Sequence, residues 1–120
     1  MNKIILSLGS NLADGQTHVA AAIEWLESVG CQCEVSSIYS SPSINGDGTM
    51  YFNAVVRGLF QCDADELSVK CKEYEAAHGR VHVKGMPVSI DIDVVVCNDC
   101  ILRPKDASRY YFTRGVKELS

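Results

Sequence analysis

The chain has 120 residues, of which 47% are hydrophobic and 22% are charged, and these values are ordinary for a globular protein. They predict a single domain over residues 1–120 that buries its own core, and they exclude an intrinsically disordered protein or one that depends on disulfide staples. With a net charge of −4 and a pI of about 5.2, the chain is not expected to bind nucleic acid over an extended surface.

Positive charge gathers in the second part of the chain. Residues 1–69 contain two basic and eight acidic residues, whereas residues 70–120 contain nine basic and seven acidic ones. A local anion site is one explanation, and a solvated helix face with a charged tail is the other. The candidate cations are Lys70, Lys72, Arg80, Lys84 and the basic residues after position 102.

Neither a signal peptide nor a membrane span is expected, because the first apolar run ends at Gly9 and is too short for either. We therefore expect a cytoplasmic protein without membrane association, whose six cysteines are free thiols. Cys97 and Cys100 have the spacing of half a zinc site or of a redox pair, but Asn98 and Asp99 between them favour a hairpin turn.

The first elements in chain order are a strand and a helix. Residues 3–8 are apolar and predict a central strand that runs into a turn. An amphipathic helix follows, which Asn11 or Asp14 can cap and which Gly30 ends. Its apolar positions recur at helical spacing and are Val19, Ala22, Ile23 and Leu26.

Two strands and a long loop come next. Residues 33–39 predict a second strand, and residues 40–49 predict a loop rich in turn formers. Residues 51–60 predict a third strand whose even-numbered side chains face the core, so Tyr51 and Asn53 point together to the other face. Such a pair could stack on and hydrogen-bond a flat heterocycle, although a polar sheet face is its commoner meaning.

A second helix follows the third strand. Asp63 and Glu66 resemble a capping box, and the helical spacing of apolar residues continues until Gly79, with Arg80 just beyond. After a connection, residues 89–96 predict a fourth strand and residues 101–102 a short hairpin strand. From Arg103 the remaining chain is predicted as a basic tail in which Tyr110, Tyr111 and Phe112 offer apolar anchorage.

Two carboxylates in the fourth strand stand out. Asp91 and Asp93 lie at positions i and i+2, so they project from the same face of the strand. Like charges held next to a sheet core repel each other unless a cation, a basic side chain or a proton lies between them. A hard divalent ion such as Mg²⁺ suits such oxygen ligands. The solvent-facing side of an edge strand is the other interpretation, and these residues alone leave both open.

The order strand, helix, strand, strand, helix, strand predicts the fold class. It is typical of an α+β, ferredoxin-like sandwich, in which an antiparallel sheet carries both helices on one face and leaves the other face free. On this prediction Tyr51, Asn53, Asp91 and Asp93 share the free face.

With these residues placed, nearly the whole chain resembles the family of 6-hydroxymethyl-7,8-dihydropterin pyrophosphokinases. The resemblance rests on four motifs, each weak alone but specific in this order and spacing. They are Gly9-Ser10-Asn11-Leu12, Tyr51-x-Asn53-Ala54, Glu75 followed by Gly79-Arg80, and Pro87-x-x-x-Asp91-Ile92-Asp93-Val94.

The resemblance implies an Mg²⁺-dependent transferase of folate biosynthesis, which moves the pyrophosphoryl group of ATP to a pterin and releases AMP. It implies two Mg²⁺ ions on Asp91 and Asp93, with Arg80 and Lys84 as further catalytic residues. The implied pterin pocket comprises Ser41, Pro42, Ile44, Tyr51 and Asn53. The implied ATP side comprises Lys72, Glu75, Arg80 and Arg114.

Some residues depart from the family's pattern. Val88 stands where the family has an arginine, the loop between Arg80 and Pro87 is short and has no tryptophan, and Ser108-Arg109 replace a histidine and a tyrosine. These departures leave a second hypothesis, a catalytically weak or inactive paralogue that serves as a pterin- or nucleotide-binding module. A third hypothesis is a ferredoxin-like interaction domain without a ligand.

Overall fold

The computed structural model describes residues 1–43, 46–80 and 87–120. Within these residues the chain forms a six-stranded sheet and four helices. The strands are β1 (Asn2–Ser10), β2 (Cys31–Val35), β3 (Tyr39–Pro42), β4 (Met50–Phe60), β5 (Asp91–Cys97) and β6 (Cys100–Ile101). The helices are α1 (Gly15–Val29), α2 (Ala64–Ala77), α3 (Pro104–Ala107) and α4 (Tyr110–Glu118).

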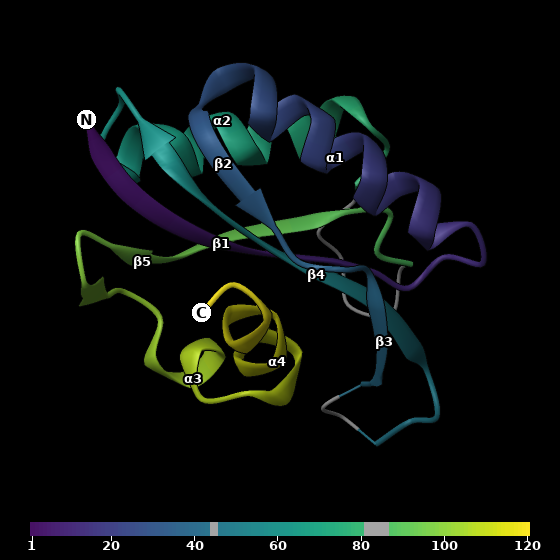
Figure 1. The fold of residues 1–120 in the computed structure, drawn as a ribbon. Helices are drawn as coiled ribbons and strands as arrows, with labels where there is room; N and C mark the ends of the chain where they lie inside the picture. Colours follow the sequence, from purple (N-terminus) through teal and green to yellow (C-terminus); the bar gives the residue numbers. More distant parts are fainter. Residues whose placement is uncertain (44–45, 81–86) are drawn as a thin grey trace.

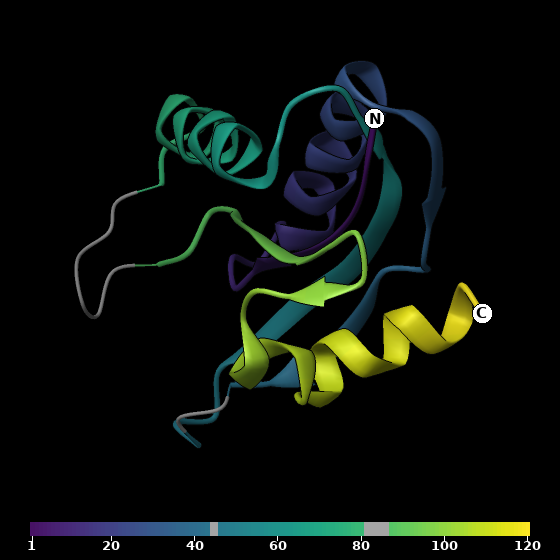
Figure 2. The ribbon, with the colours of Figure 1, turned by 90° about the vertical axis from the view of Figure 1, so that its left-hand side faces the viewer.

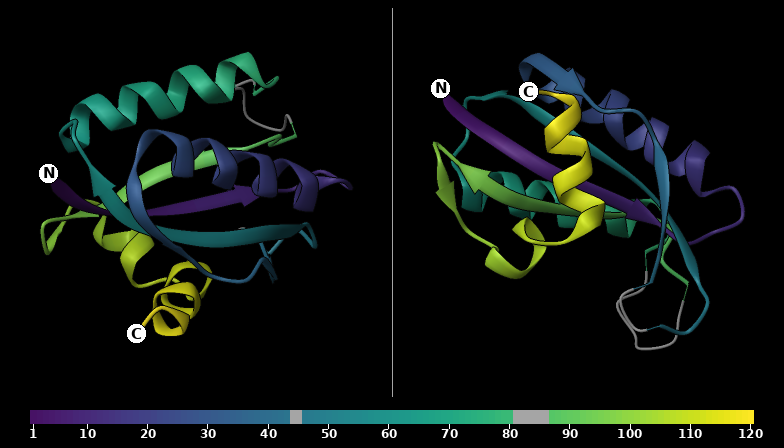
Figure 3. Two further views of the ribbon diagram at one scale, coloured as in Figure 1. Left: turned by 45° about the horizontal axis from the view of Figure 1, so that its top comes forward. Right: turned by 60° about the horizontal axis from the view of Figure 1, so that its bottom comes forward.

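The sheet is antiparallel throughout, with β1 near its centre. The strand order is β2-β4-β1-β5-β6, and β3 also pairs with β4. Helices α1 and α2 lie over one face, as Figure 1 and the left panel of Figure 3 show. This arrangement confirms the predicted α+β, ferredoxin-like class. No helix in the described part of the chain combines the length and the apolar character needed to cross a bilayer.

The main core lies between the sheet and the pair α1 and α2. Even-numbered side chains of β1, β4 and β5 point into it, as the alternation of strand residues predicts. Its fully buried members include Ile4, Leu6, Leu8, Val19, Ala22, Leu26, Ala54, Val56, Phe60, Leu67 and Cys71.

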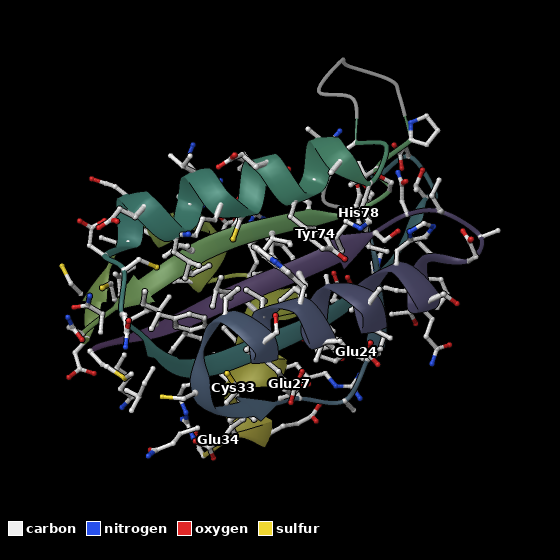
Figure 4. All side chains as sticks on the ribbon, turned by 90° about the horizontal axis from the view of Figure 1, so that it is seen from above. Glu24, Glu27, Cys33, Glu34, Tyr74 and His78 are labelled. Carbon is white, nitrogen blue, oxygen red and sulfur yellow. The ribbon has the colours of Figure 1, made fainter. Side chains whose placement is uncertain are left out.

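Helices α1 and α2 contact each other through stacked rings. The ring of Trp25 on α1 lies 4.6 Å from that of Tyr74 on α2, and Tyr74 lies 3.9 Å from the ring of His78. Figure 4 shows Tyr74 and His78 together between the two helices. The predicted capping box starts α2, since the Asp63 side chain accepts a hydrogen bond from the Glu66 backbone at 2.8 Å.

The opposite face of the sheet is not free, and this part of the prediction was wrong. Phe112 of α4 is buried against Val55 and Val95 in a second, smaller core. Gly115 lets α4 approach closely, because a Cβ atom at this position would lie 2.3 Å from Val55. Figure 2 and the right panel of Figure 3 show α4 on this face. Tail residues that looked like a charged extension therefore form a third layer.

The predicted strand over residues 33–39 is two strands. β2 ends at Val35 and β3 begins at Tyr39, and both pair with β4. Between them, the Ser36 hydroxyl oxygen accepts a hydrogen bond from the backbone of Val55 at 2.8 Å. A side chain thus takes the place of a backbone group in the ladder, which interrupts the strand.

All six cysteines are free thiols, as predicted. Cys97 on β5 and Cys100 on β6 are opposite residues in the backbone ladder of the β5–β6 hairpin. Asn98 and Asp99 form its two-residue turn with φ values of +50° and +67°, which is the left-handed conformation that such a hairpin requires. The hairpin interpretation of this segment is confirmed.

Candidate active site

A cavity of about 280 Å³ opens on the sheet face that carries α3 and α4. Its floor is made by β1, β4 and β5, and the C-terminal segment forms a wall. The residues that line it are Ser7, Leu8, Gly9, Pro42, Ser43, Tyr51, Asn53, Asp91, Asp93, Arg103, Asp106 and Tyr111. The four residues predicted to share one face therefore do so.

Strand register places Gly9 at the centre of this floor. Gly9 pairs with Asn53 on one side and with Asp91 on the other. A Cβ atom on Gly9 would lie 3.5 Å from the Asn53 side-chain oxygen and 3.6 Å from the Tyr51 ring. The missing side chain leaves room between an amide and a carboxylate, which suits a flat ligand.

Asp91 and Asp93 are close to two cations. Lys72 Nζ lies 3.6 Å from Asp91 and 3.4 Å from Asp93, and Arg103 Nη1 lies 3.9 Å from Asp93. Burial and the charge of Asp91 nevertheless raise the pKa of Asp93 to about 6, and the two cations offset this rise only in part. Burial thus disfavours the charged form of Asp93, and the neighbouring Asp91 carboxylate adds to that effect.

Two side chains of α2 reach the edge of β5 beside these aspartates. Glu75 Oε2 accepts hydrogen bonds from the backbone N–H of Ile92 at 2.8 Å and from Lys72 Nζ at 2.9 Å. Lys72 also donates to the Ile92 carbonyl at 3.2 Å. Burial lowers the pKa of Lys72, but the hydrogen bond to Glu75 and the charges of both aspartates raise it overall. A positive charge is thus fixed at the strand edge.

The C-terminal wall contains a linked set of polar groups. Arg103 Nε donates to Asp106 Oδ2 at 2.5 Å, and the Tyr111 hydroxyl donates to Asp106 Oδ1. Burial would raise the pKa of Asp106, but hydrogen bonds from Tyr111 and Arg103 lower it below its usual value. Asp106 is therefore a carboxylate that holds Arg103 next to Asp93.

Comparisons with known proteins decide the family. The profile of the family described as 7,8-dihydro-6-hydroxymethylpterin-pyrophosphokinase matches residues 5–120. The chain belongs to this family. It is 32% identical over 107 residues to the 2-amino-4-hydroxy-6-hydroxymethyldihydropteridine pyrophosphokinase of Aquifex aeolicus, covering 88% of this chain and 67% of that protein. It is 35% identical over 106 residues to the folate synthesis bifunctional protein of Chlamydia trachomatis, covering 82% of this chain but only 24% of that protein.

Of the described residues that the pyrophosphokinase resemblance assigns to the pterin, Pro42, Tyr51 and Asn53 line the cavity, and Ser41 contacts Asn53. Asn53 is buried, and its Nδ2 donates to the Ser41 hydroxyl at 2.7 Å and to the Tyr51 carbonyl at 3.3 Å. Ser41 therefore orients the amide from β3, while Pro42 lines the cavity. Ile44 lies outside the described residues.

The residues assigned to ATP are more scattered. Arg80 follows α2, and its charge is felt at the Tyr51 hydroxyl. Burial and the charge of Asp91 raise the pKa of Tyr51, and the positive charge of Arg80 opposes that rise. Arg114 instead lies over the Tyr39 ring, 4.6 Å from its centroid, and is not among the described residues that line the cavity. Lys84 falls outside the described residues.

The Gly-Ser-Asn motif of the pyrophosphokinase family anchors the segment that enters β5. The Val88 backbone N–H donates to the Asn11 side chain at 2.6 Å, and its carbonyl accepts from the Asn11 backbone at 3.0 Å and from Ser10 Oγ at 3.1 Å. Of the two residues predicted to cap α1, Asp14 occupies the cap position, although without a side-chain capping bond. Asn11 does not cap the helix and instead holds Val88.

The family motifs do not include Arg103, Asp106 and Tyr111, which follow the last motif on β5. Arg103 was predicted only as one of the basic residues after position 102 that could form an anion site, Tyr111 only as an aromatic anchor of the tail, and Asp106 was not singled out. A usable signal was present, because Pro104 favours a helix start and apolar residues recur at helical spacing in the tail. Phe112, Gly115, Val116 and Leu119 form that stripe.

Proposed function

We propose that the chain transfers the pyrophosphoryl group of ATP to 6-hydroxymethyl-7,8-dihydropterin, releasing AMP, as a step of folate biosynthesis. The observation that carries the proposal is the row formed by Asn53, Gly9 and Asp91 across three paired strands. It puts an amide that can read a heterocycle beside carboxylates that suit a metal-phosphate group. Family membership and the name of the Aquifex relative support the same reaction.

We assign the pterin to the side of the cavity around Asn53 and Tyr51. The side-chain amide oxygen of Asn53, Oδ1, borders the space above Gly9, and so does the Tyr51 ring. An amide fixed by Ser41 can discriminate a heterocycle edge, because a mismatched ligand would leave buried polar groups unpaired. Burial of Asn53 strengthens that penalty.

The aspartate pair fits Mg²⁺. Magnesium usually takes one or two carboxylates and completes its shell with water and substrate phosphates. Asp91 and Asp93 supply two hard oxygen ligands on one face of β5, and burial and the charge of Asp91 raise the pKa of Asp93, so that a bound cation would favour its charged form. In the described residues no set of three or more acidic, histidine or cysteine side chains could hold a metal. We therefore propose an open site, with two ions as the family resemblance implies, that is completed by ATP.

The proposed reaction is a displacement at phosphorus. The pterin hydroxymethyl oxygen forms a bond to the β-phosphorus, the bridge from that phosphorus to the α-phosphate oxygen breaks, and AMP leaves with the electron pair. Bound Mg²⁺ would neutralise phosphate charge and favour loss of the hydroxyl proton. Lys72, Arg80 and Arg103 supply positive charge around the cavity, and Lys84 and Arg114 remain proposed contributors.

A direct test is AMP formation from ATP that requires both the pterin and Mg²⁺. Asp91→Asn, measured alongside, should lower this rate without preventing folding. Wild-type protein that binds the pterin but forms no AMP would contradict the proposal and favour the inactive binding module instead. At present nothing in the described residues or in the family matches favours that module.

A further inference from the structure

We infer that Asp106 and Tyr111 are positioning residues that hold the Arg103 guanidinium toward the phosphates of the nucleotide. The inference rests on the proposed function, since it assigns a phosphate-bearing substrate to the cavity. It extends that function to a C-terminal segment that the family motifs do not include.

The geometry around Arg103 is that of a held side chain. Half of the Arg103 side chain is exposed, at 50%, and an arginine so exposed ordinarily samples many rotamers. Here Nε is engaged by Asp106 at 2.5 Å, whereas Nη1 stays 3.9 Å from Asp93, too far for a direct hydrogen bond. The outer end of the guanidinium therefore points toward the aspartate pair without forming a hydrogen bond to Asp93.

Asp106 is itself fixed from a second direction. Its side chain is only 19% exposed, and its other oxygen accepts the hydrogen bond from the Tyr111 hydroxyl. The Tyr111 carbonyl in turn accepts from the Tyr39 hydroxyl on β3. Burial of the neighbouring Phe112 against the sheet anchors the same turn of α4. A continuous set of contacts thus joins the rigid sheet to the Arg103 side chain.

Such support matters for phosphate chemistry. Among the described basic residues, Lys72 and Arg103 are the two within 4.0 Å of the aspartates. Lys72 is already bound by Glu75 and by the Ile92 carbonyl. Arg103 is therefore the cation whose remaining N–H groups can bind phosphate oxygens, and a fixed fork binds them at a smaller entropic cost.

A double-mutant cycle tests the inference through kcat and the KM values for ATP and the pterin. Arg103→Ala should lower kcat on the order of 100-fold or more. Asp106→Asn and Tyr111→Phe should each lower kcat on the order of 10-fold, with the KM for the pterin within about 2-fold. In the Arg103→Ala background, the same two changes should cost no more than about 2-fold, because positioning residues act only through the group they position.

Lys105→Gln is the matched control, because Lys105 is an exposed neighbour on α3 that does not line the cavity. It should keep kcat within about 2-fold. Equal losses from Asp106→Asn or Tyr111→Phe in both backgrounds would overturn the inference and indicate a structural role. A raised KM for the pterin with unchanged kcat would also overturn it, since it would indicate direct pterin contact.

The cycle stays informative if the proposed function fails. If wild-type protein forms no AMP, the same variants are compared by calorimetric affinity for Mg²⁺ with α,β-methylene ATP. Losses that vanish in the Arg103→Ala background support the positioning role, and additive losses, or no binding to wild type, overturn it. Melting curves identify a temperature at which every variant is folded, and all measurements are made there. If either Asp106→Asn or Tyr111→Phe does not fold, the other variant still tests the inference.

Discussion

Replacing Asp93 with asparagine tests whether the aspartate pair, the proposed metal site, destabilises the folded protein when no metal is bound. Asp93 is raised from an ordinary pKa of 3.8 to about 6 by burial and by the charge of Asp91. A carboxyl with a raised folded-state pKa stabilises the fold while protonated, and this contribution is lost as the pH rises through the folded-state pKa. In metal-free wild-type protein, the contribution of Asp93 to the free energy of unfolding should therefore fall as the pH rises from about 4 to about 7.

The size of the effect follows from the two pKa values. Linkage between 3.8 and about 6 gives a loss of about 2 kcal/mol in the free energy of unfolding between pH 4.5 and pH 7.5. Asp93→Asn should remove this loss, so that its stability relative to wild type rises by about 1–2 kcal/mol over the same range. The lower end allows for weakened contacts with Lys72 and Arg103.

The assay is urea unfolding of both proteins in a chelator at pH 4.5 and pH 7.5. Glu27→Gln, which removes an exposed carboxylate from the far face of α1, is the control and should leave the pH dependence within about 0.5 kcal/mol of wild type. With Mg²⁺ and ATP added at pH 7.5, wild type should be stabilised by ligand binding and Asp93→Asn much less. A difference between wild type and Asp93→Asn that does not change with pH would refute the electrostatic reasoning, and equal stabilisation by Mg-ATP would refute the metal role.

Three further predictions concern the cavity and its wall. Asn53→Ala should weaken pterin binding by about 1–3 kcal/mol and more than Tyr51→Phe, and equal calorimetric affinity in wild type and Asn53→Ala would rule out its role. If the absence of an arginine at position 88 limits turnover, Val88→Arg should raise the rate of AMP formation. If Lys84 takes the place of that arginine, Lys84→Ala should lower the rate sharply. Wild-type turnover of roughly 1 s⁻¹ or more would show that no cation is missing. Gly115→Ala should destabilise the fold by about 1–3 kcal/mol, and an unchanged urea midpoint would show that α4 does not need its close approach to the sheet.

Side-chain alternation made part of the site predictable. Asp91 and Asp93 share a face because they are two positions apart on a strand, and the same holds for Tyr51 and Asn53. These relations depend only on neighbouring residues, so they survive whatever the tertiary fold is. The pairs could therefore be identified before the structure was known, and the cavity contains all four side chains.

Other contacts had no local signal. Asn11 looked like a helix cap, but its side chain binds the backbone of Val88, 77 positions away. Glu75 was assigned to the nucleotide side, and the structure shows its carboxylate at the backbone of Ile92 on β5. An asparagine or a glutamate has the same hydrogen-bonding groups in either role, so only the approach of a distant segment selects the partner.

The sequence by itself determined which residues are strand and helix formers, which strand faces are apolar, and therefore an α+β sandwich with polar groups on the face away from α1 and α2. Tertiary structure alone decided the register that puts Gly9 between Asn53 and Asp91, and the docking of α4 that places Tyr111 against Asp106. The physical reason is range. Alternation and helical spacing are properties of a few consecutive residues, whereas register and docking are set by packing between segments that are distant along the chain.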